Sequence, residues 1–243
     1  MKILYFDCSG GVSGDMVLEV LTELGGCKET VYEKMAAADF SHQTHGTHQQ
    51  QHWQHAHSPH NGHDHDKGEH EHSHGRSYST VKELIEDSGF SSAAKETALK
   101  IYGYIAQAEA SVHGATLQTV HFHEVGRDEA VKNALGIGMA LEAIAPDKVI
   151  VSTIYDGKGT VKCSHGEIPV PVPAVMALRR QCSYSFETAD VNTEMVTPSG
   201  LAAIMGIGAE PGELVGKVIG SAEAIGKRRT GRGGLKAYIA EMD

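Results

Sequence analysis

Between residues 41 and 78 the sequence contains almost no apolar side chains, and this stretch constrains the fold more than any other. It consists mainly of histidine, glutamine, glycine and charged residues. A segment of this composition cannot bury enough apolar surface to offset the conformational entropy that it loses on ordering. We therefore expect residues 41–78 to be a disordered His-rich insertion, which divides the folded part into residues 1–40 and 79–243.

The two flanking parts alternate between strand-like and helix-like patterns. Residues 16–24 carry apolar side chains at intervals of three and four, and the same spacing runs from Ser92 to His113, with Gly114 placed to end that helix. Short apolar or alternating runs predict strands at residues 2–6, 120–125 and 148–155 and near the C-terminus. Strands that alternate with helices predict an α/β fold, here a layered mixed sheet with flanking helices.

Bulk properties exclude several classes of protein. The formal net charge of −10 argues against sequence-independent binding of nucleic acid, which requires a basic surface. No apolar run approaches the roughly 20 residues of a membrane helix, so we expect no membrane contact. The N-terminus has no long apolar region of the kind found in secretory signals. The cysteines are widely spaced and form no CxxC pair, which favours the reducing cytoplasm.

The insertion contains twelve of the 16 histidines, and its second half alternates imidazoles with carboxylates. Neutral imidazole is a ligand that suits nickel, copper and zinc. Several such ligands on one mobile segment would form rapidly exchanging sites of modest affinity. The alternative is an expression tag or a solvated linker, although a tag is usually terminal and purely histidine. The predicted ligands are His63, His65, His70, His72 and His74.

A second candidate metal site lies in "HFHEVG", residues 121–126. In a strand, His121 and His123 would project from one face roughly 6.6–6.8 Å apart and could chelate one ion. Phe122 would then point the other way, into the core. The alternative is an ordinary interior strand whose histidines form hydrogen bonds. With the neighbouring carboxylate and two histidines elsewhere in the chain, the candidate ligands are His121, His123, Glu124, His113 and His165.

The stretch "DCSGGVSGDM", residues 7–16, joins the first strand to the first helix. Its glycines expose backbone amides that can hold an anion, and its two carboxylates can hold a divalent cation between them. We assign Asp7 and Asp15 as candidate catalytic residues and Gly11, Ser13 and Gly14 as candidate cofactor-binding residues. Asp15 could equally be only the N-cap of the following helix.

Five ordered blocks together resemble the LarC family of nickel insertion proteins. They are "DCSGGVSGDM" (7–16), "AEASVHG" (108–114), "HFHEVG" (121–126), "CSHGEIPVPVPA" (163–174) and "EMVTPSGLAA" (194–203). The resemblance implies a cytoplasmic lyase that inserts Ni²⁺ into a pyridinium bis-thiocarboxylate mononucleotide. We expect neither a membrane nor a nucleic acid as a partner. In the family this reaction depends on CTP and a divalent metal such as Mn²⁺ or Mg²⁺, and it forms the nickel-pincer cofactor of lactate racemase-type enzymes. We also expect a homo-oligomer.

The chain departs from the family pattern in places. Ser9 and Gly10 stand where the family usually has phenylalanine and serine, and Glu129 and Asn133 stand near two usual aspartates. Full-length members continue into a C-terminal domain thought to hold the CTP-dependent machinery. We therefore expect an N-terminal subunit or domain of a nickel chelatase (cyclometallase), whose partner is a C-terminal LarC domain or subunit. The alternatives are a stand-alone nickel storage protein or metallochaperone and a phosphate-ester hydrolase.

We predict two classes of Ni²⁺ binding: several weak sites in the insertion and at least one tighter site on the folded part. Because imidazole must be neutral to coordinate a metal, affinity at the weak sites should fall steeply as the pH drops through about 6.5. Nickel titration of the full chain and of a variant lacking residues 41–78 measures both classes. Loss of all nickel binding in that variant would reject the site on the folded part and favour a simple carrier.

Overall fold

The computed structural model describes residues 1–40, 75–163 and 166–242. The predicted disorder of the insertion, its candidate ligands from His63 to His74, and His165 lie outside these residues. Arg76–Ser77 forms strand β2 and Tyr78 begins helix α3 (Tyr78–Asp87), so the described fold includes residues that the sequence pattern assigned to the insertion. Arg76 holds this segment in place, because its guanidinium pairs with Asp128 and donates to the Gly126 carbonyl at 3.1 Å.

The main sheet has five strands in the order β10–β11–β1–β4–β9. Strand β1 pairs in parallel with β4 and antiparallel with β11, and β4 pairs in parallel with β9. The predicted mixed sheet is therefore confirmed. The strands are β1 (Lys2–Asp7), β4 (Lys148–Val151), β9 (Glu210–Pro211), β10 (Lys217–Ala224) and β11 (Leu235–Glu241).

Strand β1 is buried on both faces, which explains its uninterrupted apolar run. Leu4 and Phe6 belong to the main core that the helices cover, and both are fully buried. Ile3 points to the opposite face, where it packs with Ile150 and Ala240 in a second, smaller cluster.

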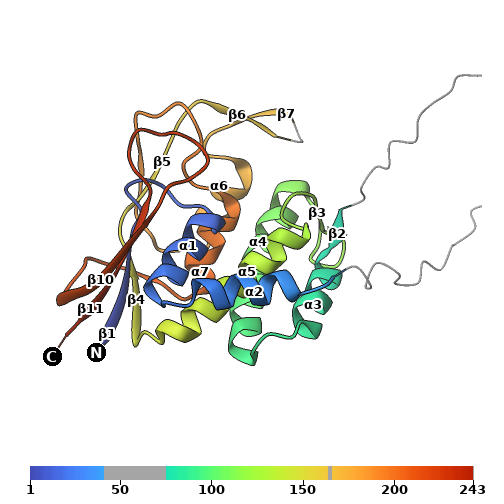
Figure 1. Cartoon of the computed structure of the whole chain (residues 1–243). Helices are drawn as coiled ribbons and strands as arrows, with labels where there is room; N and C mark the ends of the chain where they lie inside the picture. Colours follow the sequence, from blue (N-terminus) through green and yellow to red (C-terminus); the bar gives the residue numbers. More distant parts are fainter. Residues whose placement is uncertain (41–74, 164–165, 243) are drawn as a thin grey trace, which may run out of the picture.

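The helices lie on one side of the sheet, with α1 packed on β10 and β11, α7 packed on α1 and α4, and α5 packed on α1 and α4 (Figure 1). Ser91 caps the predicted long helix α4, and Gly114 ends it in the left-handed conformation, as expected. In the part of the chain that is described, no helix is long and apolar enough to cross a membrane. Besides α3, the helices are α1 (Gly14–Leu24), α2 (Lys28–Ala37), α4 (Ser92–His113), α5 (Asp128–Ile144), α6 (Pro173–Arg179) and α7 (Pro198–Gly206).

Two predicted strands were wrong in extent. The strand expected over residues 120–125 is only β3 (His121–Phe122), because its partner β2 offers two residues for pairing. The strand expected over residues 148–155 divides at Ser152, whose hydroxyl accepts the Cys8 N–H at 2.9 Å. Its second part becomes β5 (Ile154–Asp156), which pairs with β8 (Phe186–Thr188) outside the main sheet. A hairpin of β6 (Thr160–Cys163) and β7 (Gly166–Pro169) follows.

A buried carboxylate fixes the segment that leads into α7. Asp156, at the end of β5, is 1% exposed, and it pairs with Arg179 at 2.9 Å. It also accepts hydrogen bonds from the backbone N–H groups of Gly157, Met195 and Val196 at 2.8–3.2 Å. Because backbone N–H groups in the interior need an acceptor, this single side chain determines the path of the chain at residues 195–196.

We predict that Asp156→Ala lowers the free energy of unfolding by about 3–5 kcal/mol, since it leaves the Arg179 charge and three backbone donors without their acceptor. Urea denaturation measures the loss. Asp190→Ala is the matched control: it removes an ion pair with Lys158, but the Asp190 side chain is 93% exposed, so the urea midpoint should change much less than in Asp156→Ala. Equal losses in the two variants would contradict the assigned role of Asp156.

Candidate functional site

The first loop brings the N-termini of two helices together. The Val12 N–H donates to the Met195 carbonyl at 2.8 Å, and the Thr197 N–H donates to the Val12 carbonyl at 3.0 Å, which forms a parallel bridge. One residue further on, the side-chain oxygens of Ser13 and Thr197 cap α1 and α7. The two helices therefore begin side by side, and both present their N-terminal turns to the same region.

Glycines permit this close approach. A Cβ at Gly14 would lie 3.2 Å from the Ser199 hydroxyl, and one at Gly200 would lie 2.5 Å from the Val12 carbonyl oxygen. Gly11 has a positive φ of 88°, and a Cβ there would lie 2.3 Å from the carbonyl oxygen of Met195. Of the predicted cofactor-binding residues, Ser13 and Gly14 line the cavity described next, whereas Gly11 does not.

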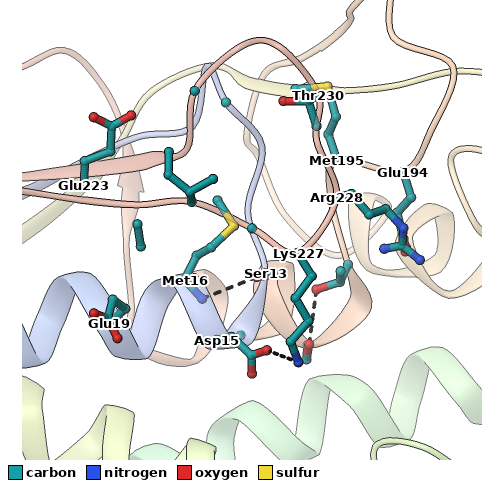
Figure 2. A pocket seen from close by; sticks show the side chains of 18 residues that line it. Ser13, Asp15, Met16, Glu19, Glu194, Met195, Glu223, Lys227, Arg228 and Thr230 are labelled. Carbon is teal, nitrogen blue, oxygen red and sulfur yellow. Dashed lines mark hydrogen bonds and ion pairs between the residues drawn. The ribbon is translucent and has the colours of Figure 1, made fainter.

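A cavity of about 420 Å³, here called the cap cavity, lies between these two helix N-termini and the loop of residues 225–234 (Figure 2). Its lining mixes hydroxyl, carboxylate and cationic groups, which suits a polar ligand with charges of both signs. The lining residues that matter here are Ser13, Asp15, Glu194, Thr197, Ser199 and Lys227.

The two carboxylates predicted in the first loop have different surroundings. Asp15 accepts from Asn133 Nδ2 at 2.8 Å and pairs with Lys227 at 2.9 Å (Figure 2), so the proposal that it is only the N-cap of α1 is wrong: Ser13 is the cap. An aspartate at position 133 would repel Asp15, whereas the amide donates to it. Asp7 accepts the Ser9 N–H at 3.0 Å and lines neither cavity.

The loop of residues 225–234, which includes "GKRRTGRGG", was missed by the sequence analysis. It folds back on the first loop, where Arg232 donates to the Ser9 carbonyl at 3.2 Å and its guanidinium lies 5.1 Å from the ring centre of Tyr155. Gly234 is required there, because a Cβ would lie 1.8 Å from the Ala224 carbonyl oxygen. A cluster of four basic residues among glycines, in a chain with a net charge of −10, was the signal that could have identified this loop.

Glu194 was also missed, although it opens the block "EMVTPSGLAA". Its side chain is 8% exposed and pairs with Arg228 at 2.5 Å, and Figure 2 shows the two side chains together at one side of the cavity. Burial raises the pKa of the Glu194 carboxyl above its ordinary value, and the Arg228 charge opposes this shift. The pair therefore holds a carboxylate and a cation together where the two cavities meet.

A larger cavity of about 670 Å³, here called the imidazole cleft, continues from the cap cavity. The two share several lining residues, including Asp15, Glu194, Lys227 and Arg228. The α4, α5 and α6 helices and the β6–β7 hairpin supply its other walls. The residues that carry ligand groups into it are His113, His123, Glu109, Glu124 and Glu129.

The structure separates the two histidines of "HFHEVG". His123 and Glu124 line the imidazole cleft together with His113, whose Nε2 lies 3.3 Å from the Glu109 carboxylate. His121 does not line it; it is exposed, and its Nδ1 lies 2.9 Å from the Thr119 carbonyl oxygen. Within residues 1–40, 75–163 and 166–242, no three His, Cys, Asp or Glu side chains are grouped closely enough to hold a metal ion.

The hairpin that carries His165 forms part of the same cleft. Val161 and Ile168 line it from facing strands, and Cys163 pairs with Gly166 at the end of the hairpin. His165 lies between these last two residues in the sequence and is outside the described part of the chain. Among its described residues, the hairpin contributes Val161, Lys162 and Ile168 to the cleft wall.

The predicted burial of Phe122 is confirmed. Its side chain is 1% exposed, and its ring lies 5.8 Å from that of Tyr102 and 6.1 Å from that of Tyr78, measured between ring centres. The Tyr102 hydroxyl donates to the Val125 carbonyl at 2.7 Å. Phe122 and Tyr102 thus fix the segment that carries His123 and Glu124 against α4.

The described residues form a mixed-sheet α/β domain with a continuous cleft lined by imidazole, carboxylate and basic side chains. The chain belongs to the nickel insertion protein family, whose profile matches residues 4–239. The resemblance drawn from the five sequence blocks is therefore confirmed. No solved structure matches the chain.

Several nickel insertion proteins are similar to this chain over most of its length. It is 34% identical to the pyridinium-3,5-bisthiocarboxylic acid mononucleotide nickel insertion protein of Acetivibrio thermocellus, over 96% of this chain and 58% of that protein. The proteins with the same name from Akkermansia muciniphila (33% identical, 94% of this chain, 57% of that one) and Lactiplantibacillus plantarum (32%, 100%, 61%) are also similar. The chain spans less than two thirds of the length of these relatives.

We predict that Phe122→Ala lowers the free energy of unfolding of the metal-free protein by about 3–5 kcal/mol, because it removes a ring packed between two others. Thermal and urea unfolding measure the change. His121→Ala, one residue away and exposed, is the control and should alter stability by less than about 0.5 kcal/mol. A small effect of Phe122→Ala would show that this segment is not held by ring packing.

Proposed function

We propose that this chain binds Ni²⁺ and delivers it to a pyridinium bis-thiocarboxylate mononucleotide, as the N-terminal part of a nickel insertion enzyme. The observation that carries the proposal is that His113, His123 and Glu124 all line one cleft in a chain of the nickel insertion family. The names of the similar proteins give the substrate. Here Ni²⁺ is a substrate that passes through the cleft.

The ligand types in the imidazole cleft suit transient binding of nickel. Imidazole binds Ni²⁺ in preference to hard cations such as Mg²⁺. Glu109 lies beside His113 on α4, and Glu124 follows His123 in the sequence, so each histidine of the cleft has a carboxylate on its own segment. An insertion site must leave coordination positions open for the acceptor, as catalytic metal sites do. The thiocarboxylate sulfur atoms of the mononucleotide are softer donors, and two of them on one rigid ring would draw the ion away from the protein.

Other groups of the chain would orient the substrate and protect the ion. Asp15 is the first-loop carboxylate used in this proposal, because it lines both cavities, whereas Asp7 lines neither. Glu129 offers a further carboxylate on the α5 wall of the cleft. The apolar side chains of Ile105, Ile137 and Ile168 line the same space and would limit access of water to the metal.

We place the CTP-dependent step, with Mn²⁺ or Mg²⁺, on a C-terminal LarC domain or subunit, because the family resemblance assigns it there. The proposed setting is the cytoplasm, with the chain acting as part of a cyclometallase and as a homo-oligomer.

A second candidate is a nickel storage protein or metallochaperone without catalytic activity. The observation that favours it is the concentration of twelve histidines between His42 and His74. A carrier would hold most of its nickel in that segment and would depend little on the cleft.

We predict that, in a variant lacking residues 41–74, the double change His113→Ala and His123→Ala weakens the tightest Ni²⁺ site at least tenfold, which is about 1.4 kcal/mol. The deletion keeps all residues of β2, and thermal unfolding of the variant checks that it folds. Calorimetric titration with Ni²⁺ measures the affinity. His121→Ala is the matched control, since this histidine lies outside the cleft, and it should leave the affinity within about twofold.

Two results would overturn the cleft as the nickel site. The first is unchanged affinity in the His113/His123 double variant. The second is loss of tight binding in His121→Ala alone, which would place the ion on the outer side of the "HFHEVG" segment. If the deletion itself abolishes all tight binding, the carrier replaces the insertion enzyme as the favoured function.

A further inference from the structure

We propose that the cap cavity binds the phosphate group of a pyridinium mononucleotide, with Lys227 as the main cationic contact. The identity of the ligand rests on the proposed function, but the chemistry of the cavity supports the assignment independently. Three separate segments meet there: the first turn of α1, the first turn of α7 and the loop of residues 225–234. Each supplies groups that bind a phosphate.

Hydroxyl groups line the wall made by the two helices. Ser13 and Thr197 are the caps, and the Ser199 hydroxyl lies 3.1 Å from that of Thr197. The two helix dipoles start side by side, and each N-terminus carries roughly half a positive charge. An anion in this cavity would therefore meet hydroxyl donors and two favourable dipoles at once.

Two cations from the loop of residues 225–234, Lys227 and Arg228, also line the cavity. Lys227 extends from its loop to Asp15, and its side chain remains 91% exposed, so the ammonium is accessible to a ligand (Figure 2). The hydrogen bond with Asp15 raises the pKa of Lys227, so this group stays charged. Arg228 pairs with Glu194 on the same side. An ammonium has three donors and a guanidinium five, so one ion pair leaves each able to bind an anion as well.

The carboxylates of the cavity select the kind of anion. Glu19 pairs with Lys28, and Glu223 accepts the Gly234 N–H at 3.2 Å, so both are engaged outside the phosphate wall. Asp15 and Glu194 remain beside the cations and would repel a ligand that is only negative. A pyridinium ring is positively charged, so a pyridinium mononucleotide complements both the cations and these carboxylates.

The connection between the two cavities determines how the ligand would be oriented. Asp15, Glu194, Lys227 and Arg228 line both, so a molecule held by its phosphate in the cap cavity can reach into the imidazole cleft. Its ring would then lie towards His113 and His123, where the proposed nickel ion would be bound before it reaches the sulfur ligands. A cavity of about 420 Å³ falls within the usual range of small-ligand sites, about 300–1,000 Å³.

The test uses nicotinic acid mononucleotide as the probe, because it combines a pyridinium ring with a phosphate monoester. Calorimetry compares its affinity for the whole chain with that of nicotinic acid riboside, which lacks the phosphate, and of uridine monophosphate, which has a neutral ring. We expect the mononucleotide to bind at least tenfold more tightly than either. Equal binding of the riboside would overturn the phosphate site, and equal binding of uridine monophosphate would overturn the selection of a pyridinium ring.

Variants locate the site. Lys227→Met should lower the affinity for the mononucleotide at least tenfold and leave that for the riboside unchanged. Arg229→Met is the matched control: Arg229 is in the same loop and exposed but lines neither cavity, so its loss should change affinity less than twofold. Equal effects of the two variants would overturn the assignment, because they would show only a general effect of charge. Thermal unfolding confirms that both variants fold.

The nickel titration separates this inference from the proposed function. Lys227 is not among the proposed metal ligands, so Lys227→Met should bind Ni²⁺ as the parent chain does. If the His113/His123 double variant keeps its nickel affinity while Lys227→Met loses the mononucleotide, the nickel site is overturned and the phosphate site is supported. The opposite pair of results overturns the phosphate site and supports the nickel site.

Discussion

The parallel bridge between Val12 and Val196 is the interaction on which the cleft depends. It sets α1 and α7 side by side, and it lies one residue before the cap of each helix. Asp156 supports the bridge from the interior by accepting the N–H groups of Met195 and Val196, and Arg179 compensates its charge. This arrangement allows the hydroxyl of Ser13 and those of Thr197 and Ser199 to line the same cavity.

The one-sided arrangement of helices on the sheet places the functional groups (Figure 1). The main sheet and the inner helices supply a rigid base, while α4, α5 and the β6–β7 hairpin form the walls of the imidazole cleft. Ligand groups lie at helix ends and in short segments, such as His113 at the end of α4 and His123 just after β3. Segments of this kind can adjust to a metal ion without unpacking the core, because the neighbouring Phe122 is held by two aromatic rings.

In the proposed function, the imidazoles of the cleft would hold the metal ion, and the cations and hydroxyls of the cap cavity would hold the phosphate of the nucleotide. The two cavities differ in their ligand groups, since His113 and His123 line only the imidazole cleft, whereas carboxylates line both cavities. Asp15 and Glu194, each paired with a cation, stand where the two cavities meet.

Local patterns in the chain were enough for the α/β class, the extent of α4, the burial of Phe122 and membership of the nickel insertion family, because each depends on periodicity or on a contiguous motif. The length of β3 depended on its partner β2, which lies some 45 positions earlier in the chain. Because β3 ends at Phe122, His123 lies beyond the strand, and its side chain need not share a face with His121. Glu194 and the loop of residues 225–234 became part of the site only through ion pairs with Arg228 and Asp15 and through the Val12–Val196 bridge. The Val12–Val196 and Asp15–Lys227 contacts join residues about 180 to 210 positions apart, and the Glu194–Arg228 pair joins residues about 34 positions apart. No local periodicity records any of them.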